Sequence, residues 1–199
     1  MADDASSSSK KRKADKEAEF WDPRTIKRLT KEFARIPKDS KTSATQYSVH
    51  LEDDDIGRWV VRYYYDDLPE GVNKHAKLLS SQLKERDLSY VEMMFIFSPD
   101  YPGKPPFVYN SFPRLWGSFL SPCGALCHEM LHPSHGWTGS MNLSTFIIAL
   151  RSILEEDVQA RLFTRDVGGE SSGSELLRNN EETARRTNDF YLAAHRSGY

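Results

Sequence analysis

Residues 98–106 read Ser-Pro-Asp-Tyr-Pro-Gly-Lys-Pro-Pro, and they decide the fold together with two short motifs that follow them. The first motif is Gly124-Ala125-Leu126-Cys127-His128, and the second is Gly136-Trp137. Because four of the nine residues in 98–106 are prolines, this stretch is expected to form a rigid, irregular crossing. Residues 107–136 show no clear helix or long strand, and a long loop in a compact domain is usually functional.

The elements before the crossing are predicted from caps and periodicity. Asp22-Pro23 is typical of a helix start, and an apolar stripe follows at helical spacing, formed by Ile26, Leu29, Phe33 and Ile36. Residues 66–88 are polar and irregular, which predicts a loop. Three segments alternate or are rich in aromatic and β-branched residues and are predicted as strands: Gln46–Glu52, Trp59–Tyr65 and Tyr90–Phe97.

Two helices are predicted after the crossing. Asn142 caps the first, whose apolar residues recur at the spacing of a buried face. A Gly/Ser linker over Asp166–Ser174 separates it from a mostly polar helix over Ser174–Ala194. Strands followed by helices predict an α+β domain, with an antiparallel meander sheet of about four strands, an N-terminal helix and C-terminal helices.

The bulk composition is that of a soluble globular protein. The chain has 199 residues, of which 28% are charged and 38% apolar, and its net charge is −2. That charge gives no general attraction to nucleic acid, and no apolar run is long enough to span a membrane. We therefore expect no nucleic acid and no membrane among the partners, and we expect a monomer.

The first 19 residues are polar and are expected to be disordered, which leaves one domain over residues 20–199. Its core is expected over 22–165 and its C-terminal helix over about 174–195. The run Lys10-Lys11-Arg12-Lys13 is typical of a nuclear-import patch, and a solubilising tail is the alternative. The expected location is accordingly both nucleus and cytoplasm.

Two cysteines, Cys123 and Cys127, do not make a disulfide framework, and a reducing compartment would keep them as thiols. One alternative is a zinc site built from these cysteines and His128, His132 and His135. The spacing of that set matches no common zinc finger or knuckle, so we expect no metal and no cofactor.

Taken in this order, the motifs resemble the ubiquitin-conjugating enzymes over roughly residues 22–165. The resemblance includes the first helix, where Ile26–Phe33 lies, and Trp59 on the second strand. It continues through the proline-rich crossing, the Gly-Ala-Leu-Cys lead-in to Cys127, Gly136-Trp137 and the helix after Asn142. Gly-Ala-Leu-Cys is the form of the Q-type branch, whose C-terminal ending is also similar to His195–Tyr199.

The chain departs from the common pattern of the family at three places. The His-Pro-Asn triplet ahead of the cysteine is missing, as it is in the Q-type branch, and Trp116-Gly117-Ser118 is the nearest stretch. Phe119 stands eight residues before the cysteine, where the Q-type branch has Tyr. Gly103 follows Tyr-Pro, where many relatives carry a Phe that contacts RING-type ligases.

The resemblance implies that 20–199 is a catalytic domain in which Cys127 receives ubiquitin from an activating enzyme and holds it as a thioester. Cys127 then transfers ubiquitin to a substrate or a ligase. A thiolate is the required nucleophile, and loop amides, the Ser118 hydroxyl or His128 are candidates for stabilising the oxyanion. A protonated His128 would also lower the pKa of the thiol. His195 is a further candidate if the C-terminal tail folds back.

The expected partners are ubiquitin, the activating enzyme and ubiquitin ligases. The basic face of the first helix, with Lys27, Arg28 and Lys31, is the candidate docking surface for ligases. The alternative to an active enzyme is a catalytically inactive variant that acts as a ubiquitin- or ligase-binding scaffold, because His-Pro-Asn is missing. Retention of Cys127 favours the active enzyme. A transfer to Ser/Thr hydroxyls, linked to the Q-type branch, is an open expectation.

Overall fold

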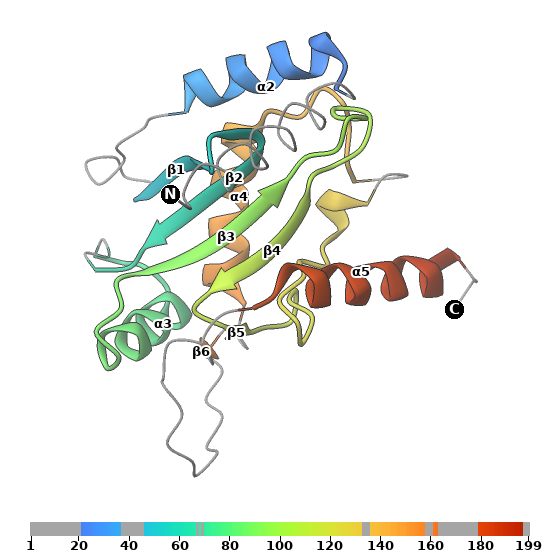
Figure 1. Ribbon diagram of the computed structural model, residues 1–199. Helices are drawn as coiled ribbons and strands as arrows, with labels where there is room; N and C mark the ends of the chain where they lie inside the picture. Colours follow the sequence, from blue (N-terminus) through green and yellow to red (C-terminus); the bar gives the residue numbers. More distant parts are fainter. Residues whose placement is uncertain are drawn as a thin grey trace, which may run out of the picture.

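A four-stranded antiparallel sheet forms the centre of the structure (Figure 1). The computed structural model describes residues 21–36, 46–66, 68, 70–132, 136–157, 161–162 and 179–196, with 190–196 described as backbone only. The strands are β1 (Tyr47–Glu52), β2 (Asp55–Tyr64), β3 (Tyr90–Ile96) and β4 (Phe107–Phe112). They pair in the order β1-β2-β3-β4, so the sheet is a meander and the predicted α+β fold is confirmed.

The described part of the chain also contains four α-helices and several shorter elements (Figure 1). The helices are α2 (Pro23–Arg35), α3 (Lys74–Lys84), α4 (Leu143–Glu156) and α5 (Glu181–Arg196). A two-stranded pair joins β5 (Leu115–Trp116) to β6 (Arg161–Leu162), and a 3-10 turn, η1, spans Glu129–Leu131. Figure 1 shows α4 behind the sheet and α5 beside β4, at the sheet edge where the candidate site lies.

The two faces of the sheet bury different sets of side chains. Trp59, Val61 and Tyr63 alternate along β2 and face the main core, where the Tyr63 hydroxyl donates to the carbonyl of Ile147 in α4 at 2.9 Å. Val60 points to the opposite face, in a smaller cluster with these residues: Met94, Ile96, Tyr109, Ala125 and Ala184. Because Ala184 belongs to α5, the last helix covers the second face with its first turns.

The predicted helix starts agree with the structure, and one predicted loop does not. The Asp22 side chain accepts the Arg24 amide, and the Asn142 side chain accepts the Ser144 amide, as N-caps do. Residues 66–88, predicted to form a loop, contain α3. Its buried residues are Ala76, Leu79, Ser80 and Leu83, so two small side chains concealed a helical stripe.

The region 107–136 was also predicted without a long strand, and this was wrong for β4. β4 pairs with β3 along its whole length, with Val108 opposite Phe95 in the core. Its sequence, Phe-Val-Tyr-Asn-Ser-Phe, has polar residues that are buried by tertiary contacts, which hides the strand from a sequence pattern. The C-terminal helix begins at Glu181, whereas residues 174–178 lie outside the described part of the chain.

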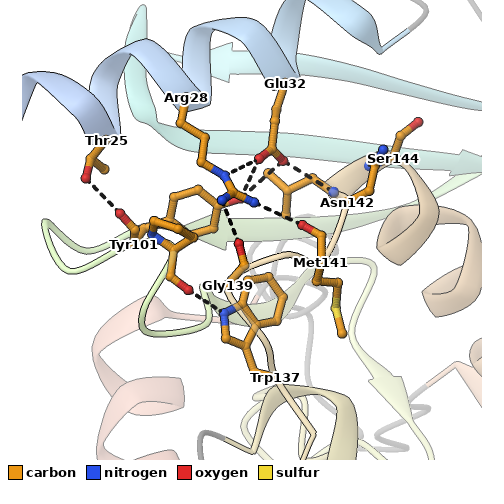
Figure 2. A network of polar contacts seen from close by, with 11 residues as sticks. Thr25, Arg28, Glu32, Tyr101, Trp137, Gly139, Met141, Asn142 and Ser144 are labelled. Carbon is orange, nitrogen blue, oxygen red and sulfur yellow. Dashed lines mark hydrogen bonds and ion pairs between the residues drawn. The ribbon is translucent and has the colours of Figure 1, made fainter.

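Arg28 joins α2 to the proline-rich crossing and to the start of α4 (Figure 2). Its guanidinium donates to Glu32 and to the Gly139 carbonyl at 2.6 Å each, and to the Met141 carbonyl at 3.2 Å. The Tyr101 hydroxyl donates to both carboxylate oxygens of the same Glu32, at 3.0 and 3.1 Å. The crossing is therefore fixed by buried polar contacts as well as by its prolines.

Candidate active site

Cys127 lies at the end of a short hairpin that leaves β5 and returns toward η1. Leu120 and Leu126 form an antiparallel bridge in this hairpin. The Cys127 amide donates to the Phe119 carbonyl at 2.8 Å, one residue beyond the bridge. The backbone of the candidate nucleophile is thereby fixed to the preceding strand.

The returning strand of the hairpin is also attached to the central sheet. The Leu126 amide donates to the Val108 carbonyl at 2.9 Å, and the Asn110 amide donates to the Gly124 carbonyl at 2.8 Å. Because Val108 and Asn110 belong to β4, the residues that lead to Cys127 extend the sheet beyond its last strand.

Gly124 allows the C-terminal segment to approach this hairpin. Its φ is +87°, and a Cβ there would lie 2.4 Å from the Asn179 side-chain nitrogen and 2.7 Å from the Asn110 carbonyl oxygen. Asn179 donates to that carbonyl at 2.9 Å and precedes α5. The only residue type without a Cβ is thus required three residues before Cys127, as the Gly-Ala-Leu-Cys motif provides.

The Cys127 side chain is exposed, and the Cys123 side chain is half-buried; both are free thiols. Among the residues that the structure describes, no three His, Cys, Asp or Glu side chains converge as a metal site would need. His135, part of the zinc alternative, lies outside the described residues. An exposed thiol at the end of a fixed hairpin is accessible to a large acyl donor.

His128 holds the segment on the other side of Cys127. Its Nδ1 accepts the Met130 amide at 3.2 Å, which caps η1, and its ring packs edge-on against Phe119 with a centroid distance of 4.9 Å. Burial lowers the pKa of His128 from 6.5, although the nearby Glu129 raises it. At neutral pH the ring is therefore uncharged, and the predicted electrostatic activation of Cys127 by a protonated His128 is not supported.

The Ser118 hydroxyl is engaged elsewhere. It donates to one carboxylate oxygen of Asp157 at 2.8 Å, and the Ser118 amide donates to the other oxygen at 2.6 Å. Asp157 is buried at the C-terminal end of α4. Because its single proton is used in this contact, Ser118 has no proton left for an oxyanion, and it acts instead as a link between the Cys127 hairpin and α4.

Gly136 and Trp137 position the segment after η1. The Gly136 and Trp137 amides both donate to the His132 carbonyl, at 3.0 and 2.9 Å. The Trp137 indole nitrogen donates to the Pro102 carbonyl at 2.8 Å, so the proline-rich crossing contacts the segment that follows the cysteine (Figure 2). The three motifs recognised in the sequence thus meet in space.

The sequence comparisons fit this arrangement. No family model matches the chain. It is 27% identical over 128 residues to ubiquitin-conjugating enzyme E2 Q1 of human and mouse, which covers 64% of this chain and 29% of each relative. It is 29% identical over 93 residues to a human ubiquitin-conjugating enzyme, the E2 Q-like protein 1, which covers 47% of this chain and 53% of that protein. The chain is a relative of the Q-type ubiquitin-conjugating enzymes.

The structural comparison gives the same fold for this Q-type relative. Human ubiquitin-conjugating enzyme E2 G1 superposes with a TM-score of 0.50 at 22% identity, over 68% of this chain and 98% of that structure. The likeness establishes the ubiquitin-conjugating fold. The chain spans less than a third of the length of the E2 Q1 relatives that it matches.

The basic face of α2 in this Q-type relative differs in one respect from the sequence prediction. Lys27 and Lys31 are exposed, as expected for a docking surface. Arg28, predicted to belong to the same surface, instead turns inward and binds Glu32 and two backbone carbonyls. Helical spacing gave its direction only approximately, since a long side chain can reach across to a neighbouring loop.

Two further features of the Q-type relative concern its termini and surface. The backbone of His195 belongs to α5, and its side chain lies outside the described residues, so its predicted role stays a prediction. No described helix has the length and apolar character needed to cross a membrane. Asp157, Asn110 and Asn179 were missed in the sequence, because only the folded chain brings them to the hairpin.

Proposed function

We propose that this chain accepts ubiquitin as a thioester on Cys127 and transfers it to a substrate or a ligase. The observation that carries the proposal is an exposed cysteine whose backbone is fixed between Phe119 and the edge of the sheet. The similarity to the Q-type enzymes supports the choice of ubiquitin as the modifier.

The chemistry requires only a thiolate and an activated acyl donor. The Cys127 thiolate attacks the thioester carbonyl of ubiquitin on its activating enzyme, and the activating enzyme's own sulfur leaves as a thiolate. A free thiol titrates near pH 8.5, so a minority of thiolate is present at neutral pH, and thiolate is a strong nucleophile even as a minority species. A later nucleophile then displaces Cys127 in the same manner.

The partners follow from the same proposal. Lys27 and Lys31 present two cations on adjacent turns of α2 and are exposed, which fits an acidic surface on the activating enzyme or a ligase. Gly103 is exposed and has no side chain to contact a RING-type ligase. We propose that the protein acts as a monomer, with a role for His195 in acyl transfer, and that it works in nucleus and cytoplasm; Lys10–Lys13 lies outside the described residues.

The test is a charging assay with ubiquitin, activating enzyme and ATP, read on non-reducing and reducing gels. Wild type and Cys123→Ala are expected to gain one ubiquitin in a band that thiol reductant removes, whereas Cys127→Ala is expected to gain none. Cys123→Ala is the matched control, because it removes the other thiol of the same hairpin. Charging of Cys127→Ala, or an adduct that survives reductant, would contradict the proposal.

A catalytically inactive scaffold is the second candidate, and one observation favours it. The two side chains nearest in sequence that could stabilise an oxyanion are a neutral His128 used as a cap and a Ser118 bound to Asp157. Folded wild-type protein that binds ubiquitin but takes no adduct, beside a conjugating enzyme that charges in parallel, would establish this alternative.

A further inference from the structure

The oxyanion formed at Cys127 needs a donor that no side chain beside the cysteine supplies. Ubiquitin-conjugating enzymes with His-Pro-Asn have a side-chain amide ahead of the cysteine, and this chain has Phe119 there, with no polar atom in its side chain. The Ser118 hydroxyl donates to Asp157, and His128 caps η1. The remaining donors close to Cys127 are backbone amides, which can be counted one by one.

Most amides of the hairpin already have an acceptor. Pro122 has no N–H, and Ser118 donates to Asp157. Acceptors within 117–125 and on β4 take the amides of the following residues: Leu120, Ser121, Gly124, Ala125, Leu126 and Cys127. Between 118 and 127, only the amides of Phe119 and Cys123 have no acceptor among the residues that the structure describes.

These two amides lie at opposite ends of the hairpin. Cys123 is at the turn, where the Gly124 amide donates back to the Ser121 carbonyl at 2.8 Å. It is four residues from Cys127, which corresponds to roughly 13 Å along an extended strand. Phe119, in contrast, is the residue directly opposite Cys127, since its carbonyl accepts the Cys127 amide.

The register determines the direction of the Phe119 amide. Leu120 and Leu126 form a bridge whose hydrogen bonds run from Cys127 to Phe119 and from Ser121 to Ala125. In an antiparallel ladder the N–H and C=O of one residue point to the same neighbouring strand, so the Phe119 N–H faces the backbone of Cys127. Directly opposed residues also project their side chains to the same face, which places the Cys127 thiol beside Phe119.

We propose that the backbone N–H of Phe119 is the oxyanion donor for acyl transfer at Cys127. This inference rests on the proposed function, because it describes the thioester on the same cysteine. The amide is held in place by its neighbours: the Ser118 amide and hydroxyl are bound to Asp157, and the Phe119 carbonyl is bound to Cys127. A donor fixed before the reaction costs no reorganisation as the charge develops.

The step balances without any added reactant. A neutral amine or hydroxyl attacks the thioester carbonyl carbon, and the π electrons of the C=O bond move to its oxygen, which accepts the Phe119 N–H. The carbonyl re-forms, the carbon–sulfur bond breaks, and Cys127 leaves as a thiolate. The proton of the attacking group passes to solvent. A backbone donor serves amine and hydroxyl acceptors alike, because it contacts only the oxygen of the thioester.

The test replaces one atom of the backbone. Incorporating 3-phenyllactic acid at position 119 converts the amide into an ester, which removes the N–H and keeps the Phe side chain and its carbonyl. The matched control has lactic acid at position 123 and is compared with Cys123→Ala, since the Cys123 amide is also without an acceptor among the described residues. Each protein is charged with ubiquitin to completion, the activating enzyme is quenched, and single-turnover discharge to a small amine and a small alcohol is followed.

The 119 ester is expected to slow discharge on the order of 10²-fold, as for the loss of a single oxyanion donor, with an unchanged melting temperature. The 123 ester is expected to discharge like Cys123→Ala, and Phe119→Leu, which keeps the amide, like the wild type. Discharge of the 119 ester at the wild-type rate would overturn the inference and leave the proposed function standing. A wild type that takes no ubiquitin would overturn both.

Discussion

Gly136 packs so closely on Glu129 that a Cβ at position 136 would lie 1.6 Å from the Glu129 carbonyl oxygen. It would also lie 2.5 Å from the carbonyl carbon of the same residue and 3.1 Å from the Met130 Cα. All three atoms belong to the backbone of η1, so no side-chain rotation relieves the contact. The glycine before Trp137 therefore fixes the segment that follows Cys127.

We expect Gly136→Ala to destabilise the fold by about 1–3 kcal/mol, because η1 must shift to admit the methyl group. Gly139→Ala is the control in the same segment: its nearest contact is the Pro102 carbonyl oxygen at 3.4 Å, an ordinary van der Waals distance. Urea unfolding of both variants measures the difference. Equal stability of the two variants would contradict the close packing on Glu129.

A second glycine pair separates backbone strain from steric contact. Gly124 and Gly71 have nearly the same φ, +87° and +88°, but only Gly124 has neighbours within reach of a Cβ. Gly71→Ala should show the cost of a left-handed alanine alone, about 1 kcal/mol, and Gly124→Ala should cost more through contact with Asn110 and Asn179. Thermal unfolding checks this order, and Asn179→Gly in the Gly124→Ala background should recover part of the loss.

The Arg28 network gives a third prediction. Arg28→Met keeps the aliphatic stem but leaves the Gly139 and Met141 carbonyls and the Glu32 carboxylate without the guanidinium. We expect a loss of about 1–3 kcal/mol, the usual cost of leaving buried polar groups unsatisfied. Lys27→Met, on the exposed face of the same helix, should change stability by less than about 0.5 kcal/mol. A loss of stability as large in Lys27→Met would argue against the network.

The fold could be predicted where the sequence carried its own local signal. The caps at Asp22 and Asn142, the strand over β3 and the proline-rich crossing are each specified by a few consecutive residues. α3 and β4 were missed because their patterns are diluted: α3 buries Ala76 and Ser80 beside its leucines, and β4 buries Asn110 completely. Asn110 is tolerated there because its side chain binds the Glu92 carbonyl and the Leu115 amide, which no local pattern reveals.

The site could be predicted as far as the cysteine itself. Cys127 follows from the order of motifs, but the partners of its hairpin come from distant parts of the chain: Asp157 from the end of α4 and Asn179 from the start of α5. The sequence also made Ser118 a candidate donor, and its contact with Asp157 could not be anticipated from spacing. Tertiary contacts thus decide which polar groups near Cys127 remain available.

The last prediction concerns pH and His128. Burial lowers its folded pKa below 6.5, with an opposing effect of Glu129, so the unfolded chain takes up a proton first as the pH falls. Stability from this residue is complete above pH 6.5 and decreases as the pH falls from there toward the folded pKa. Protonation also makes Nδ1 a donor, which removes the cap on the Met130 amide.

His128→Asn is the sharp variant, because Asn caps helices well but does not titrate. Unfolding free energies at pH 7.5, 6.5 and 5.5 should fall more steeply toward acid in the wild type than in His128→Asn. Burial and the nearby Arg62 also lower the pKa of His50, although Glu92 opposes them, so His50 adds acid sensitivity of the same sign. His50→Asn therefore serves as the control that measures that contribution separately. If His128→Asn were as acid-sensitive as the wild type while remaining equally stable at pH 7.5, the neutral capping role of His128 would be wrong.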